Sequence, residues 1–198
     1  MAFDYDLVEG WYAANSAKGF DFLLRFAPEK RILLASDGSL TLGLEALFGA
    51  NIAVRVKRNT TSWLRSDTAS YLDETIGLPA LEREVWLMAN DTRLVFAHSL
   101  IPKNRLGDWL GKALEQGADP LGKVLELKKI PIIKEMLEIG AIRSGEVCVE
   151  LGIALETILV ARRYRMFNRK DNNEWLIKAQ ITEVFSPELI AYPKVPRS

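Results

Sequence analysis

Alternating and continuous apolar runs predict several β-strands along the chain. Residues 81–89 and 93–102 flank the turn-forming residues Asn90 to Thr92 and predict a β-hairpin. Residues 157–167 and 174–185 predict a second strand pair, joined through a polar turn. Shorter strands are predicted at residues 52–56 and 146–151.

Other segments have helical spacing. The aromatic-rich residues 1–30 predict one or two short helices, and residues 40–48 predict a helix that Asp37 or Ser39 caps and Gly49 ends. Further helices are predicted at residues 106–114, 121–127 and 131–140. Residues 58–80 have no clean period, and we expect them to form a flap.

The order of these elements indicates a fold class. Consecutive predicted strands form hairpins, and the predicted helices are grouped between them. This order favours an α+β fold with a largely antiparallel sheet over a doubly wound parallel sheet. No internal repeat or linker interrupts the 198 residues. We therefore expect one domain over residues 1–198, with residues 1–30 as a helical extension.

Three charged residues fall on predicted apolar strand faces. Glu183 shares its face with Ile177, Ala179, Ile181 and Phe185. By the same alternation Arg83 faces inward in the hairpin, and Arg162 faces inward in residues 157–167. A buried carboxylate needs a cationic or hydrogen-bonding partner, because leaving it ionised and alone costs several kcal/mol.

Two interpretations of these charges remain open. Glu183 can form a structural salt bridge with Arg83 or Arg162. Alternatively, two arginines and one glutamate leave a surplus positive charge inside an apolar cavity, which suits an anionic ligand.

Composition excludes several function classes. Lys plus Arg and Asp plus Glu each number 26, so no net field draws the protein to nucleic acid or to an anionic membrane. The one cysteine, Cys148, and the one histidine, His98, exclude an intramolecular disulfide and a Cys/His zinc cluster. No signal peptide, membrane span, catalytic triad, phosphate loop or dinucleotide fingerprint is present. We expect a cytoplasmic protein that uses no cofactor and no metal.

Two further features are ambiguous. In residues 117–122 Asp119 can cap a helix and Pro120 can begin it, so that the N–H groups of Leu121 and Gly122 face a carboxylate ligand. Such helix starts are common in ordinary proteins. His98 lies on an apolar face, where a lone histidine is more often a hydrogen-bonded core residue than a catalyst.

Four short blocks, in order, resemble chorismate lyase, the enzyme family that releases pyruvate from chorismate to give 4-hydroxybenzoate. The blocks are DGSLT at 37–41, REVWL with AHSLIP at 83–87 and 97–102, DPLGKVL with EIG at 119–125 and 138–140, and ARRYR with TEVFSP at 161–165 and 182–187. The resemblance covers approximately residues 31–190. Each block is short, so the weight of the match comes from the order in which the four blocks occur.

The resemblance implies site residues and a fold. The family's ligand-binding positions correspond to Leu40, Arg83, Leu121 and Glu183, and two of these already stand out by strand alternation. Its fold is an antiparallel sheet with helices on one side and the ligand enclosed beneath helical flaps. The family usually has Arg at the position of His98, a difference that we expect to affect the choice of substrate.

The implied function is a cofactor-free lyase acting on chorismate. Arg83 and Glu183 are the expected catalytic residues, with Glu183 as the acid that assists departure of the enolpyruvyl group. Leu40, Leu121, Gly122 and Arg162 join them as expected substrate-binding residues.

Two alternatives stay open. One is a non-catalytic sensor of aromatic carboxylates, resembling the effector domain of bacterial transcription regulators, although some 30 non-basic residues before the first block are too few for a DNA-binding domain. The other is a lyase of altered regiochemistry. The sequence leaves the oligomeric state unknown.

Overall fold

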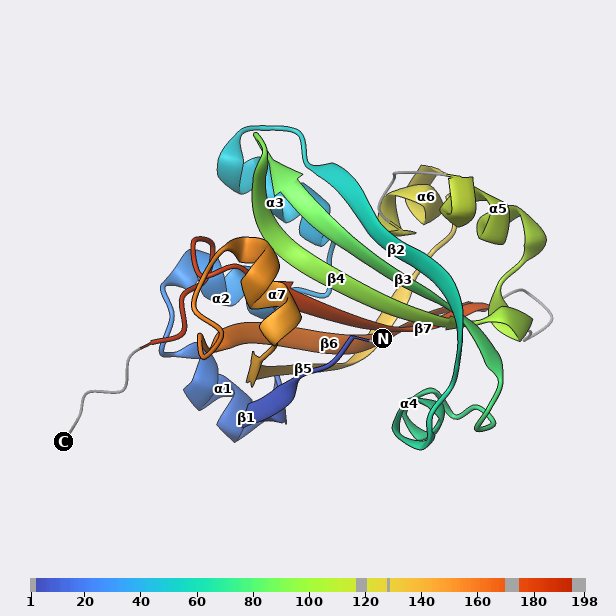
Figure 1. The fold of residues 1–198 in the computed structure, drawn as a ribbon, viewed down its shortest axis with the longest axis horizontal. Helices are drawn as coiled ribbons and strands as arrows, with labels where there is room; N and C mark the ends of the chain where they lie inside the picture. The colour runs from blue at the N-terminus through green and yellow to red at the C-terminus, as the bar shows by residue number, and fades with distance from the viewer. Residues whose placement is uncertain (1–2, 117–120, 128, 170–174, 194–198) are drawn as a thin grey trace.

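The computed structural model describes residues 3–116, 121–127, 129–169 and 175–193. Within these ranges the strands form one seven-stranded sheet in the order β1-β5-β6-β7-β4-β3-β2, and every neighbouring pair is antiparallel (Figure 1). The predicted α+β fold with a largely antiparallel sheet is confirmed.

The element bounds are as follows. The strands are β1 (Asp6–Ala13), β2 (Ala53–Trp63), β3 (Pro79–Ala89), β4 (Thr92–Pro102), β5 (Ile133–Arg143), β6 (Leu159–Arg169) and β7 (Trp175–Phe185). The α-helices are α1 (Ala17–Leu23), α2 (Pro28–Ala35), α3 (Leu40–Phe48), α4 (Ser66–Leu72), α5 (Asp108–Gln116), α6 (Leu121–Leu127) and α7 (Gly145–Leu151), and a 3-10 turn covers Lys103–Arg105.

Local sequence explains the two best-defined connections. The hairpin between β3 and β4 turns at Asn90 and Asp91, which have φ values of 45° and 67°, the left-handed conformation that tight hairpins require and that Asn and Asp tolerate. Helix α3 begins where the Ser39 side chain accepts a hydrogen bond from the Leu42 N–H, and it ends at Gly49 with φ of 61°. Both predictions are confirmed.

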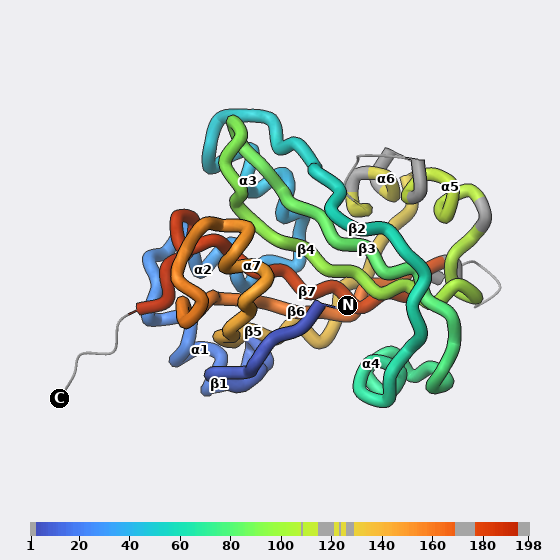
Figure 2. The backbone as a smooth tube through the Cα atoms, in the orientation of Figure 1, coloured from blue at the N-terminus to red at the C-terminus, as the bar shows by residue number. Residues whose placement is uncertain are grey.

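The helices cover the two faces of the sheet unequally. Helices α1, α2 and α3 pack on one half of one face, and α5 and α6 pack on the other half of the same face. Figure 2 shows these two groups at opposite ends of the sheet. Helices α4 and α7 lie on the other face, within separate apolar clusters. We call the first face the ligand face, because the cavity described below opens on it.

Four predicted elements are wrong. Residues 6–13 were expected to be helical, but they form the edge strand β1, which pairs with β5. This pairing needs Gly140, because a Cβ there would lie 2.9 Å from the backbone oxygen of Gly10. Only part of residues 1–30 is helical, so these residues are not a helical extension.

The expected helix at residues 131–140 is mostly strand β5, whose register shifts between Glu135 and Glu138. Met136 lies in this shift with φ of 52°, and such a bulge breaks the alternation that identifies a strand. The expected strand at residues 146–151 is α7, which ends at Gly152 with φ of 68°.

Residues 58–80 do not form the expected flap, and none of them lines the cavity described below. Residues 58–63 continue β2, and α4 packs through Ala69 and Leu72 on the opposite face. In the part of the chain that the structure describes, no helix is long and apolar enough to cross a membrane.

Candidate active site

A cavity of about 490 Å³ lies on the ligand face, between the two helix groups. Its volume falls in the range of pockets that hold small organic ligands, roughly 300 to 1,000 Å³. Its apolar lining comes from α3 and from four strands and includes Leu40, Val85, Leu87, Ala97, Met166 and Ile181. Such a lining suits a ring.

Glu183 lies on the cavity floor and is held from two sides. Across the β6/β7 pair, Arg162 is its direct neighbour, and Arg162 Nε donates to Glu183 Oε2 at 2.5 Å. Tyr164 Oη donates to Glu183 Oε1 at 3.0 Å. Glu183 is 5 % exposed and Arg162 is 1 % exposed, so this ion pair is withdrawn from water.

The remaining contacts of Arg162 fix the position of the pair. Its Nη1 donates to the carbonyl oxygens of Leu33 at 2.5 Å and Ser36 at 3.0 Å, at the end of α2. Arg162 is not among the residues that line the cavity. Its Nε and Nη1 are directed at Glu183 and at the backbone, and its expected contact with the substrate stays a prediction.

Tyr164 completes the polar floor. Burial raises its pKa well above the usual value, and the charge of Glu183 acts in the same direction. Tyr164 therefore stays protonated and donates to Glu183.

Arg83 lines the same cavity from β3 and is only 2 % exposed. Strands β4 and β7 follow β3 in the sheet, so Arg83 and Glu183 project from one face with one strand between theirs. The strand alternation read from the sequence thus matches the structure for both residues. Their catalytic roles remain predictions.

Leu40, Leu121 and Gly122 also line the cavity. Leu40 enters at the start of α3, while Leu121 and Gly122 begin α6. The predicted helix cap, Asp119 with Pro120, lies outside the described residues.

Sequence reasoning gave no site role to several polar residues of the cavity, among them Lys129, Lys134 and Tyr164. Tyr164 lies two residues after Arg162 in β6 and therefore shares its face of the sheet. Lys134 was overlooked because its segment was taken for a helix, and the bulge after it conceals the strand alternation.

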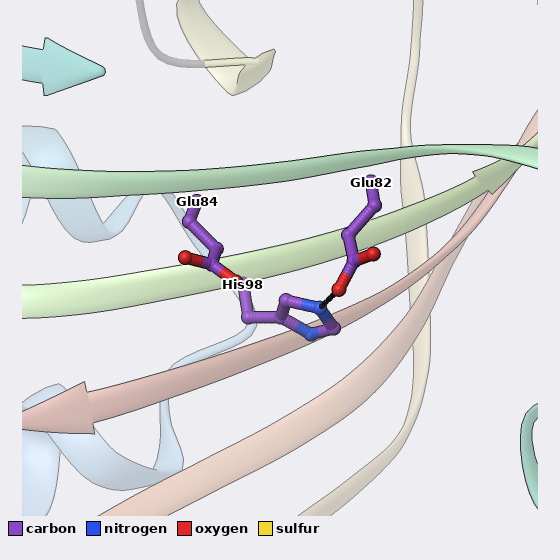
Figure 3. A group of neighbouring side chains, drawn as sticks. All are labelled: Glu82, Glu84 and His98. Atoms are coloured by element: carbon purple, nitrogen blue, oxygen red, sulfur yellow. Dashed lines mark hydrogen bonds and ion pairs between the residues drawn. The ribbon is translucent and has the colours of Figure 1, made fainter. Parts of the chain in front are cut away.

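His98 lies on the opposite face of the sheet. Figure 3 shows it beside Glu82 and Glu84, and its Nε2 lies 3.0 Å from Glu82 Oε1. This hydrogen bond is the main cause of a lowered pKa of Glu82. His98 does not line the cavity, and its expected effect on the choice of substrate stays a prediction.

Glu82, Glu84 and His98 are the described residues whose ligand atoms come close enough, within 4.8 Å, to hold a metal ion. However, Lys57 and Arg58 each lie 3.4 Å from the carboxylate of Glu84. These two side chains already supply positive charge to the Glu84 carboxylate without a metal ion. We therefore interpret Glu82, Glu84 and His98 as part of a buried ion-pair network.

Comparison with solved structures defines the fold class. The effector domain of PhnF from Mycobacterium smegmatis matches with a TM-score of 0.56 and 14 % identity, over 81 % of this chain and 96 % of that one. A GntR-family transcriptional regulator from Bacillus cereus matches with a TM-score of 0.53 and 10 % identity, over 74 % of this chain and 99 % of that one. These likenesses show the fold class, an α+β domain with an antiparallel sheet of the kind found in GntR-family effector domains.

The particular family follows from sequence. Residues 34–193 match the family described as "Chorismate pyruvate-lyase Rv2949c-like", and the chain belongs to this family. A relative from Methylococcus capsulatus, named "Probable chorismate pyruvate-lyase", is 37 % identical over 94 residues, which are 48 % of this chain and 58 % of that protein. The resemblance seen in the four sequence blocks is confirmed.

Proposed function

We propose that this protein eliminates pyruvate from chorismate and forms 4-hydroxybenzoate or a closely related hydroxybenzoate. Membership of a chorismate pyruvate-lyase family supports a lyase. The observation that carries the proposal is the cavity itself. Arg83 and Glu183 line the same largely apolar cavity, and Glu183 is held there by hydrogen bonds from Arg162 and Tyr164.

The reaction supplies its own driving force. The C–O bond to the enolpyruvyl group breaks, the ring carbon that carries the hydroxyl loses its proton, and the ring becomes aromatic. The released enolpyruvate takes up a proton and becomes pyruvate. No electrons are gained or lost overall, so the protein has to bind, orient and move a proton.

The cavity residues suit these tasks. Arg83 binds the ring carboxylate, and Leu40 packs on the ring. Leu121 and Gly122 approach from the start of α6, where backbone N–H groups have no partner within the helix and can bind a polar substituent.

The contacts of Glu183 change the role that the sequence suggested. Both of its carboxylate oxygens accept hydrogen bonds, one from a guanidinium and one from a phenol. Because both oxygens act as acceptors in this geometry, we assign Glu183 as the base that accepts the ring proton rather than as the acid. Arg162 and Tyr164 are positioning residues that hold it.

A turnover experiment tests the proposal. Purified protein is mixed with chorismate, pyruvate is followed by a coupled lactate dehydrogenase reaction, and the aromatic product is identified by chromatography. We expect equal amounts of pyruvate and hydroxybenzoate. Glu183→Gln, which keeps the size of the side chain, is expected to lower kcat by about 10²-fold or more.

The alternative is a sensor that binds an aromatic carboxylate without turnover. It is favoured by the likeness to a domain that is called an effector domain in PhnF. Binding of chorismate with no pyruvate above the level of a protein-free control would support the sensor and contradict the lyase.

A further inference from the structure

Lys134 lies at the mouth of the cavity, above the groups that carry the proposed chemistry. It projects from β5, lines the cavity together with Tyr164 and Glu183, and places Nζ 4.9 Å from the centre of the Tyr164 ring. We propose that Lys134 forms a second anion-binding subsite, which binds the carboxylate of the enolpyruvyl group and stabilises the charge on that group as it leaves. The identity of this group rests on the proposed function.

The two cationic side chains lie at different depths. Arg83 is 2 % exposed and belongs to the floor of the cavity. Lys134 is half-buried, and its neighbours across the mouth, Gly38 and Ser39, are exposed. A ligand with two carboxylates can therefore place one deep at Arg83 and the other near solvent at Lys134.

Lys134 has hydrogen-bonding capacity for such a ligand. Its Nζ donates to the carbonyl oxygen of Gly38 at 2.5 Å. An ammonium group has three donors, so two remain. Among the described residues, the ion pairs within 4.0 Å include no carboxylate partner of Lys134.

The electrostatic surroundings favour an anion. Burial lowers the pKa of Lys134, while the negative charge of Glu183 acts in the opposite direction. The Glu183 charge is already compensated by Arg162 at 2.5 Å. A carboxylate bound at Lys134 would restore the interactions that its ammonium loses on leaving water.

The same position suits the bond that breaks. When the C–O bond cleaves, its electron pair stays on the oxygen of the departing enolpyruvate, and Glu183 takes the ring proton. Lys134 then faces the new negative charge at the side of the cavity from which pyruvate leaves, and a proton from water completes pyruvate.

A merely structural role for Lys134 makes a different prediction. If Lys134 only fastens the loop at Gly38 to β5, its removal weakens all ligands alike. Two probes separate these roles: 4-hydroxybenzoate, which has one carboxylate, and 3-(1-carboxyvinyloxy)benzoate, an unreactive aromatic compound with a ring carboxylate and an enolpyruvyl carboxylate.

The experiment measures calorimetric affinities of both probes for the wild type, Lys134→Met and Lys134→Arg, with Lys103→Met as a control for net charge, because Lys103 is exposed and distant from the cavity lining. In Lys134→Met we expect about tenfold weaker binding of the dicarboxylate and less than about twofold change for 4-hydroxybenzoate. Lys134→Arg should recover most of the loss.

Equal weakening of both probes in Lys134→Met would overturn the subsite. The same selective loss in Lys129→Met would also overturn it, because the effect would then belong to the general charge of the mouth. If Lys134→Met does not fold, Lys134→Gln replaces it and must show the same selective loss of the dicarboxylate. Selective binding without chorismate turnover would support the subsite while contradicting the proposed lyase.

Discussion

Arg162 and Glu183 face each other across β6 and β7, and their side chains form a buried ion pair with 2.5 Å between Nε and Oε2. The pair lies at the base of the cavity, and Arg162 also binds the backbone at the end of α2. Arg162 therefore connects the sheet to helix α2 and also holds Glu183, the residue proposed to accept the ring proton.

Removing Arg162 should destabilise the fold strongly. Arg162→Met leaves Glu183 buried without its cation, and we expect a loss of about 3 to 5 kcal/mol in the free energy of unfolding. Denaturant titration measures it. Arg163→Met is the matched control, because Arg163 pairs with Glu138 across β6 and β5 but both side chains are partly exposed. Its expected loss is about 1 to 2 kcal/mol, and equal losses would contradict the importance of burial.

Removing Arg83 should weaken ligand binding. Arg83→Ala is expected to reduce the affinity for 4-hydroxybenzoate by about 2 to 5 kcal/mol, because a buried charge partner of the ring carboxylate is lost. Isothermal titration calorimetry measures the change. Arg55→Ala, at an exposed position of β2, should leave the affinity unaltered. An unchanged affinity in Arg83→Ala would remove Arg83 from the site.

His98 should affect stability but not binding. His98→Ala removes the hydrogen-bond partner of buried Glu82 and is expected to cost about 1 to 3 kcal/mol of stability. Because His98 faces away from the cavity, the affinity for 4-hydroxybenzoate should change less than about twofold at a temperature where the variant is folded. A selective loss of affinity would show that the two faces of the sheet are coupled.

Glu9 should contribute to the free energy of unfolding at neutral pH, and this contribution should be lost at acid pH. Burial raises its pKa, but hydrogen bonds from Arg25 and Tyr192 outweigh this and lower the pKa below the usual 4.5. A lowered carboxyl pKa contributes stability above the unfolded value, and this contribution disappears as the pH falls through the folded value. The stability advantage of the wild type over Glu9→Gln should therefore be full above about pH 5.5 and shrink below pH 4.5.

Denaturant titrations between pH 3 and 7, with Glu188→Gln as an exposed control, measure this difference. An advantage that grows toward low pH would contradict the sign.

Local sequence determined much of the fold and part of the site. The alternation in β3, β4, β6 and β7 identified the central strands, because each has a largely apolar face and no register shift within the stretch that lines the cavity. The same alternation placed Arg83, Arg162 and Glu183 on one face. It could not distinguish a cation that touches the ligand from one that holds a carboxylate, since both project from the same side.

Strands β1 and β5 were not predictable in this way. Strand β1 is short and partly exposed, and the register of β5 shifts at Met136, so neither has a clean period of two. The apolar residues Val147, Cys148 and Leu151 fit either a helix or a strand. Only packing against the other face of the sheet makes them a helix.

The sequence by itself determined the central strands, the helix at residues 40–48, and the inward direction of Glu183 and Arg83, because these depend on neighbours within one segment. It also carried the resemblance to a lyase family, through four short blocks in a fixed order. Only the tertiary structure decided that Arg162 binds Glu183, that His98 lies behind the sheet, and that Lys134 stands over the cavity. Those relations depend on which distant segments pack together, and no local period records them.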